Sequence, residues 1–330
     1  MKYTREILLD LSKDLVAKRF ENDQKVDAVF LLGSVRPEDA QIDHPTDVDL
    51  LVLHNGDISR ERELVKISPD YHFDIFFEET SMYNNPKELR SDGWRGWAMW
   101  DPCLLHQKGR FFEYTQSILR SQFDEPKNII ARAKHFSASS RQQWESFTSE
   151  QAKTIPKTFL KAVYNAANAF ACLARPPYTK RYFLSQFFVQ ATEMDATDLI
   201  TSLLDCICET RNPDIARKGI QQWEHCYSLA TQAFASYTIH PLRQNYYLDA
   251  ITSQAQSEFP AAALWPYTFT WAYISEESQS NKEIADAWTK VSRELGYSPT
   301  KFPDRLHALD LFLEQIEDII QQVSDDYGVD

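Results

Sequence analysis

Two short segments decide the fold: Leu31-Leu32-Gly33-Ser34 and, after a loop of twelve residues, Asp47-Val48-Asp49-Leu50. The first segment closes an apolar run from Val29 to Leu32 that is typical of a β-strand. Gly33 then permits a sharp turn and the close approach of a phosphate group, because glycine has no Cβ. Ser34 adds a hydroxyl to the backbone N–H groups of that turn. We therefore expect a strand that ends in a phosphate-binding turn.

The second segment predicts a strand that presents two acids on one face. Apolar residues alternate with Asp47 and Asp49, and side chains two apart on a strand share a face. The strand rise places these carboxylates about 7 Å apart along the chain, and they repel each other unless a cation lies between them. Hard oxygen ligands of this kind suit Mg²⁺ bound together with substrate phosphates. A third acid, Asp74, interrupts the apolar run 71–77, and a buried strand seldom carries a lone acid. If that run pairs beside the second segment, Asp74 faces the same site.

This combination of a Gly-Ser turn, a spacer, an Asp-x-Asp strand and a later acid resembles the nucleotidyltransferase fold of the DNA polymerase beta superfamily. The resemblance covers roughly the first 125 residues. It implies that Asp47 and Asp49 hold one or two Mg²⁺ ions, and that Gly33 and Ser34 hold the phosphates of a nucleoside triphosphate, ATP by default. It also implies that Asp74 is catalytic, as a ligand of the second metal, as the base for an acceptor hydroxyl, or as both.

Three basic residues are candidates for contacts to the triphosphate. Many relatives carry a basic residue three places after the serine, and in this chain Arg36 stands one place earlier than that. Farther along, residues 175–182 read as a proline turn that leads into a helix starting with Lys180 and Arg181. Free N–H groups at helix starts attract anions, so this pair is a candidate clamp for the β- and γ-phosphates. The alternative, that both are solvated charges on a surface turn, stays open.

Composition and charge set the class of the protein. A chain of 330 residues, 43% hydrophobic and 25% charged, suggests a soluble protein of two domains. The net charge of −13 argues against a general nucleic-acid binder and is compatible with a cationic small substrate. We expect no signal peptide and no membrane-spanning segment, since no apolar run approaches ~18 residues. The five scattered cysteines favour a reducing, cytoplasmic location.

Two other patterns each have a structural and a functional interpretation. A group of three cysteines and a histidine in the C-terminal half raises the alternative of zinc, but structural zinc needs four convergent ligands and residues two apart on a helix do not face each other. Tryptophans that recur every three residues favour a stripe packed on a core, with a wall that stacks a base or sugar ring as the alternative. These two groups are Cys206, Cys208, His225 and Cys226, and Trp94, Trp97 and Trp100.

The hydrophobic patterns divide the chain into residues 1–125, the predicted catalytic domain, and residues 126–330, an all-helical domain that would cover substrate and nucleotide. Thr4, Thr179 and Asp195 are candidate helix N-caps. The sequence thus predicts an α/β domain, with a small mixed sheet and flanking helices, followed by an all-α domain. In the first domain we expect a helix at 4–22, a partial helix within 86–100, and strands at 26–32, 47–53, 71–77 and 103–106. In the second, breakers separate helices at 127–149, 155–174, 179–193, 196–209, 213–236, 244–257, 261–275, 281–295 and 303–325.

This order of domains resembles the antibiotic nucleotidyltransferases of the kanamycin and streptomycin type, in which substrates lie between a catalytic sheet and a helical domain. The resemblance implies a Mg²⁺-dependent enzyme that moves a nucleoside monophosphate, AMP from ATP by default, onto a hydroxyl of a small acceptor, such as an aminoglycoside-like antibiotic, with release of pyrophosphate. Two alternatives stay open: a toxin- or antitoxin-type nucleotidyltransferase that modifies a protein or an RNA, and a nucleotide-binding regulatory module without turnover. The three costly carboxylates count against the module.

Overall fold

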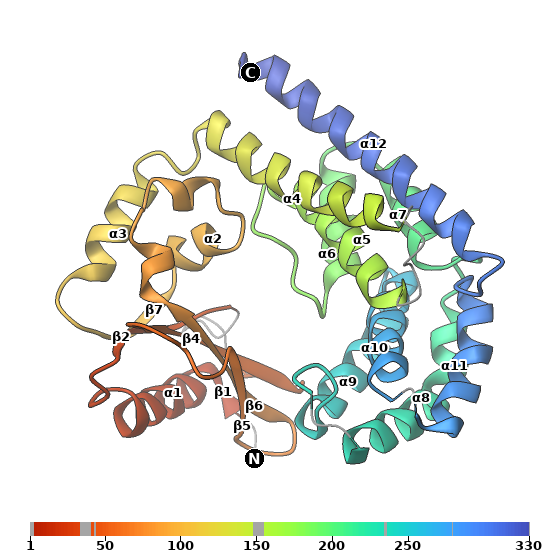
Figure 1. The fold of residues 1–330 in the computed structure, drawn as a ribbon, viewed down its shortest axis with the longest axis horizontal. Coiled ribbons are helices and arrows are strands. Elements are labelled where there is room, and N and C mark those ends of the chain that lie inside the picture. Colours follow the sequence, from red (N-terminus) through yellow and green to blue (C-terminus); the bar gives the residue numbers. More distant parts are fainter. Residues whose placement is uncertain are drawn as a thin grey trace. The chain divides into compact units, whose positions relative to one another are not determined.

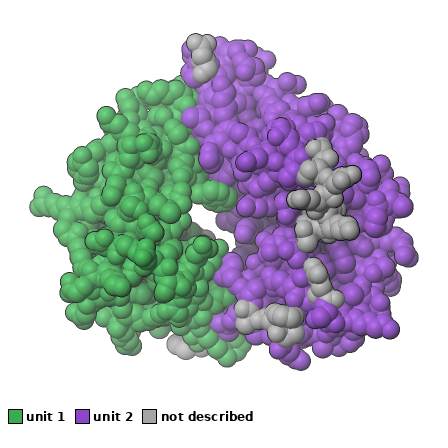
Figure 2. Space-filling view, viewed as in Figure 1, with its two compact units in different colours: residues 1–128 green, residues 129–330 purple. Residues whose placement is uncertain are grey.

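The structure, a computed structural model, describes residues 3–33, 41–42, 44–147, 155–233, 236–278 and 280–329. The chain forms two compact units, Met1–Asn128 and Ile129–Asp330 (Figure 2). The first unit contains a small sheet with helices on both faces, and the described residues of the second form helices and turns (Figure 1). The fold is therefore the α/β domain and the helical domain that the sequence predicts, in that order.

A mixed five-stranded sheet is the centre of the first unit (Figure 1). The strands of this unit are β1 (Tyr3–Thr4), β2 (Val26–Leu31), β3 (Gln41–Ile42), β4 (Thr46–His54), β5 (Arg62–Lys66), β6 (Tyr71–Glu79) and β7 (Cys103–Gln107). The sheet has the order β5-β6-β4-β2-β7, in which β4 and β6 run parallel and each other neighbouring pair runs antiparallel. A separate two-stranded sheet pairs β1 with β3.

The alternation of side chains along β4 divides its residues between two cores. The even-numbered positions from Val48 to Val52 pack with α1 (Arg5–Arg19) on one face of the sheet. Thr4 caps that helix as predicted, because its Oγ1 accepts a hydrogen bond from the N–H of Ile7. Leu51 and Leu53 point to the other face, where they pack with α2 (Arg95–Trp100) and α3 (Phe111–Arg120). Asp47 and Asp49 share this second face, and they lie near the start of the strand, before the part that α2 and α3 cover.

The partial helix expected within 86–100 is two short helices. They are the 3-10 helix η2 (Glu88–Ser91) and α2, and another 3-10 helix, η1 (Thr80–Tyr83), precedes them. Gly96 lies where the two helices meet, and a Cβ there would be 2.3 Å from the carbonyl oxygen of Leu89. Gly96 weakens the helical pattern of residues 86–100, but the close packing of η2 and α2 requires a glycine at this position.

The second unit has its own core, built from helices that match the predicted periods. The α-helices are α4 (Pro126–Ser146), which begins at the end of the first unit, α5 (Ile155–Ala171), α6 (Phe183–Glu193), α7 (Asp198–Ile207), α8 (Asp214–Ala233), α9 (Gln244–Ala255), α10 (Leu264–Glu277), α11 (Lys282–Leu295) and α12 (Phe302–Tyr327), with 3-10 turns η3 (Pro241–Arg243) and η4 (Pro260–Ala263). Trp265 and Trp271 of α10 are almost fully buried in this core. None of the described helices is long and apolar enough to cross a membrane.

Two predicted N-caps of the second unit are wrong. Thr179 precedes a turn, and α6 begins only at Phe183. Both the backbone N–H and the hydroxyl of Thr179 donate to the side-chain oxygen of Gln186, so this residue fastens the turn to the helix side. Asp195 has a φ of 54° in the left-handed region, and α7 begins at Asp198. Each connection is longer than the sequence suggests because turn residues occupy positions that helical periodicity alone would accept.

Candidate functional site

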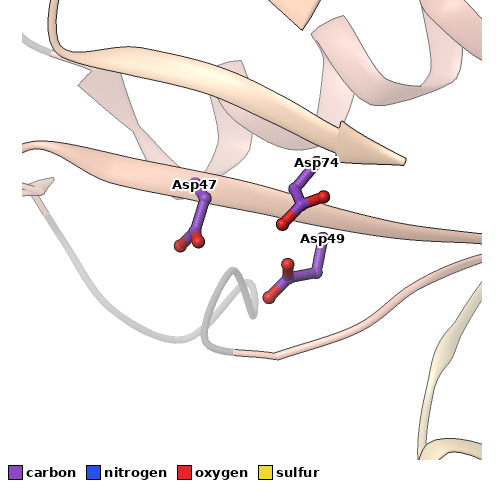
Figure 3. Close-up of side chains that lie close together, drawn as sticks. All are labelled: Asp47, Asp49 and Asp74. Carbon is purple, nitrogen blue, oxygen red and sulfur yellow. The ribbon is translucent and has the colours of Figure 1, made fainter. Parts of the chain in front are cut away.

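Three acids from two neighbouring strands meet on one face of the sheet. Asp47 and Asp49 project from β4 on the same side, as strand alternation requires. The parallel pairing of β4 with β6 places Asp49 directly beside Asp74. One carboxylate oxygen of each acid lies within 4.8 Å of those of the other two (Figure 3). The condition on which the sequence interpretation of Asp74 depended, that its strand pairs beside the Asp-x-Asp strand, is therefore met.

The acids are withdrawn from water to different degrees. The side chain of Asp74 is 1% exposed, whereas Asp47 and Asp49 are half-buried. Burying an ionised carboxylate is costly unless a cation or several hydrogen bonds compensate it. Three such groups this close together concentrate negative charge where the dielectric constant is low. The arrangement therefore calls for positive charge from the protein, from an ion, or from both.

The acid cluster fits a hard divalent cation. All three groups offer carboxylate oxygens, which Mg²⁺ prefers, and two oxygens bound to one Mg²⁺ at about 2.0–2.1 Å lie at most ~4.2 Å apart. Small side-chain movements from the observed spacing would bring the oxygens into that range. Within the described part of the chain, no other group of histidine, cysteine or acidic side chains has this geometry. The zinc interpretation thus gains no support, and His225 instead pairs with Glu283 at 2.7 Å.

The turn after β2 lies against the acids. The backbone N–H of Leu32 donates to the carbonyl oxygen of Asp49 at 2.8 Å, which fixes the end of β2 beside β4. Gly33 follows with a φ of +74°, and a Cβ at this position would lie 3.1 Å from Oδ2 of Asp49. Glycine is therefore required both by the backbone conformation and by the close approach of the carboxylate. Ser34 and Arg36 lie outside the described residues, so their predicted phosphate contacts stay predictions.

Arg62 is a residue of this site that the sequence patterns did not reveal. It comes from the edge strand β5, and its Nε and Nη2 donate to Oδ1 and Oδ2 of Asp74, each at 3.0 Å. Its guanidinium also lies over the ring of Phe76, 3.5 Å from the centroid. The five residues of β5 carry charges at both ends, so they show too little apolar pattern to predict a strand. The sequence signal that could have indicated such a residue was Asp74 itself, because a buried acid needs a cationic partner.

The other acids on β6 have partners of their own. Glu78 lies on the same face as Asp74, about 13 Å farther along the strand. Its Oε2 accepts hydrogen bonds from the hydroxyl of Tyr83 at 2.5 Å and from Nε of Arg95 at 3.2 Å. Burial, and then the charge of Glu78, raise the pKa of Tyr83 well above its ordinary value. Glu78 therefore belongs to a structural network next to α2.

In the second unit, Lys180 and Arg181 lie in the turn before α6 and not in the helix itself. Lys180 is exposed, whereas Arg181 is 3% exposed, pairs with Asp249 and lies over the ring of Tyr246. The side-chain amide of Gln254 donates to the carbonyl oxygen of Arg181 at 2.7 Å, which anchors the turn. The basic pair of this turn thus consists of a buried, structurally engaged arginine and an exposed lysine. Whether either cation binds phosphate stays a prediction.

The tryptophan stripe has a mainly structural role. Trp97 and Trp100 both pack against Phe123, with ring centroids 5.0 and 4.7 Å away. They belong to the core beneath α2 and α3. Trp94 differs, because 46% of its surface is exposed. Two of the three tryptophans therefore pack in a core, and the third is partly exposed.

Comparisons with known proteins add little to this geometry. No protein-family model and no curated protein matches the chain. A solved structure of a nucleotidyltransferase-like protein from Exiguobacterium sibiricum 255-15 is similar at 13% sequence identity, with a TM-score of 0.31, over 95% of this chain and 91% of that one. So low a TM-score carries no argument about function. The case for function therefore rests on the acids and on their surroundings.

Proposed function

We propose that this protein is a Mg²⁺-dependent nucleotidyltransferase that moves a nucleoside monophosphate from a triphosphate, with ATP as the default donor, onto a hydroxyl of a small acceptor. The observation that carries the proposal is the meeting of Asp47, Asp49 and Asp74 on adjacent parallel strands, next to a glycine turn. This combination suits a nucleotidyl transfer, because negative charge develops on the phosphates and the reactants must be aligned.

Each residue of the site would have a distinct part in the transfer. Asp47 and Asp49 would hold Mg²⁺, which stabilises charge on the phosphate oxygens. Gly33 would let the triphosphate approach the backbone closely. The acceptor oxygen forms a bond to the α-phosphorus, the bond from that phosphorus to the bridging oxygen of the β-phosphate breaks, and pyrophosphate leaves. Asp74 would take the hydroxyl proton, complete the metal site, or do both, provided that the hydroxyl comes within hydrogen-bond reach.

The acceptor is best sought among small molecules that carry both hydroxyl and amino groups. The net charge of −13 disfavours a polyanionic acceptor and attracts a cationic one. An aminoglycoside-like compound is one member of this class. ATP and Mg²⁺ as co-substrate and cofactor are part of the same proposal.

The test is pyrophosphate release from each of the four common nucleoside triphosphates, with and without Mg²⁺, across a panel of amino-sugar and other hydroxyl-bearing acceptors. A parallel thermal-shift series with nucleotide and metal separates binding from turnover. We expect nucleotide to stabilise the protein only when Mg²⁺ is present, and release to need an acceptor. Stabilisation by nucleotide that is indifferent to metal, without release, would favour a regulatory module and contradict the proposal.

A further inference from the structure

The pair formed by Arg62 and Asp74 is built into the sheet. In the antiparallel pairing of β5 with β6, Leu64 lies opposite Asp74 and Arg62 lies opposite Phe76. The guanidinium therefore reaches diagonally, by two positions, to the acid, which is within the range of a long side chain on one sheet face. It rests on the Phe76 ring on the way, 3.5 Å from the centroid. Two hydrogen bonds of 3.0 Å fix the carboxylate plane as well as its position.

The edge strand that carries Arg62 is itself held in place. Arg19 of α1 donates to both oxygens of Glu63, the residue that follows Arg62, at 3.3 and 2.7 Å. Arg60 pairs with the same acid at 3.2 Å. The backbone N–H of Phe77 donates to the carbonyl oxygen of Glu61 at 2.9 Å. These contacts on both sides of Arg62 restrict its backbone, so its guanidinium has a defined position beside Asp74.

Charge gives this position a consequence for metal binding. Arg62 adds a positive charge beside three carboxylates, so it offsets part of the negative charge that would attract a divalent ion. An arginine remains charged at any working pH. A carboxylate has about four lone-pair positions, and the paired arginine uses two of them, so the ion pair does not by itself prevent Asp74 from contacting a metal ion. The charge of Arg62 should therefore weaken the binding of divalent ions to the acids.

We propose that Arg62 is a positioning residue of the proposed nucleotidyl transfer, which fixes the orientation of the Asp74 carboxylate and whose positive charge weakens the binding of divalent ions to the three acids. This inference rests on the proposed function. It predicts that the nucleotide-free protein binds a divalent ion less tightly with Arg62 in place than without its charge. A merely structural ion pair would hold β5 to β6 and would leave the affinity for the ion unchanged.

The experiment titrates the full chain with Mn²⁺ alone and measures bound and free ion by electron paramagnetic resonance. Arg62→Gln removes the charge and keeps one amide donor. Arg62→Lys keeps the charge and loses the planar guanidinium that makes two hydrogen bonds to Asp74. Arg60→Gln is the matched control, because Arg60 is a cation of the same segment that pairs with Glu63 and not with Asp74. Asp49→Asn reports whether the acids are the site that is titrated.

The parent should bind Mn²⁺ at the acids. Arg62→Gln should bind Mn²⁺ roughly tenfold more tightly or bind an additional ion, since a nearby positive charge has been removed. Arg62→Lys and Arg60→Gln should stay within about twofold of the parent, because Lys keeps the charge near the acids and Arg60 pairs elsewhere. Parent-like binding by Arg62→Gln, with Asp49→Asn binding none, would overturn this inference alone. Absence of Mn²⁺ binding by the parent, or its persistence in Asp49→Asn, would overturn the proposed function as well.

The catalytic readout separates position from charge. With an acceptor found in the release assay, Arg62→Lys should lower kcat while the nucleotide KM stays near that of the parent, because the orientation of Asp74 is lost and the nucleotide-binding groups are intact. This variant also keeps the proposal testable if Arg62→Gln does not fold. Equal kcat in Arg62→Lys and the parent would show that the two guanidinium hydrogen bonds do not position Asp74 for the reaction.

Discussion

Among the single residues of the site, Asp47 and Asp49 carry the most direct prediction. Asp47→Asn or Asp49→Asn should reduce pyrophosphate release to background and abolish the stabilisation that Mg²⁺ gives with nucleotide. Without metal, each variant should melt at the parent's temperature or slightly above it, because repulsion between close carboxylates is relieved. Asp10→Asn, at an exposed position on α1, is the control and should change neither property. Unchanged Mg²⁺-dependent release in either site variant would remove the metal assignment.

Asp74→Asn should separate chemistry from nucleotide binding. Asp47 and Asp49 lie on one strand and remain able to hold the metal and nucleotide, so affinity should stay within a few-fold of the parent. Turnover should fall by about 10²–10⁴, the usual contribution of a positioned acid or base. Calorimetric affinity measured beside the release rate decides the matter, and retained turnover would place the base elsewhere.

The same substitution has a cost for stability that Arg62 determines. Removing one partner of a buried ion pair costs about 3–5 kcal/mol when both are fully buried, and the loss here should be smaller because Arg62 is 27% exposed. The double variant Arg62→Gln/Asp74→Asn should be more stable than Asp74→Asn alone, as measured by denaturant unfolding. Additive losses from the two single changes would mean that the ion pair contributes little.

The residues that the sequence could and could not identify differ in their surroundings. Asp47, Asp49 and Asp74 were predictable because each is a charge inside an apolar strand pattern. Arg62 was not, since it lies on a short edge strand rich in charges, where a further arginine carries no signal. Its role depends on a diagonal contact between strands, which no local pattern encodes.

Among the secondary-structure elements, the turn after β2 gives a prediction with a close control. Gly33→Ala should destabilise the protein by roughly 1–2 kcal/mol for the left-handed backbone alone, and its Cβ would also press on Asp49. Gly109→Ala is the matched variant, because Gly109 has a φ of +66° and a Cβ added there would meet no described side chain or backbone within 4 Å beyond its chain neighbours. Nucleotide KM should rise only in Gly33→Ala. Equal KM values in the two variants would exclude a role for this turn in phosphate binding.

Element boundaries were predictable where a chemical signal ends a helix. α11 begins after Asn281, whose side chain accepts from the first free N–H groups, and ends at Gly296 in the left-handed conformation. The start of α6 was misplaced by four residues, from 179 to 183, because a polar turn satisfies the same pattern as a first helical turn. The positions of short strands and turns depend on tertiary contacts, whereas long helices can be predicted from the hydrophobic period of their own sequence.

Across the complete chain, the order of the two domains followed from the loss of strand patterns after the first 125 residues. The structure divides at Asn128 and Ile129, and each unit has its own apolar cores. Hydrophobic periodicity suffices for this division, because the cores of each unit are made only from residues of that unit. Hydrophobic periodicity contains no information on the functions of the exposed groups in either unit.

Lys180 provides the test of whether the helical unit takes part in nucleotide binding. If the exposed lysine contacts the γ-phosphate equally in the ground state and the transition state, Lys180→Ala should raise the nucleotide KM several-fold and leave kcat nearly unchanged. Lys218→Ala removes an exposed lysine from α8 of the same unit and should alter neither constant. Calorimetry with a non-hydrolysable ATP analogue gives the binding term directly. Equal affinity of Lys180→Ala and the parent would show that Lys180 does not contact the triphosphate. A loss of affinity that vanishes at high ionic strength would instead support a phosphate contact, because salt screens an exposed charge.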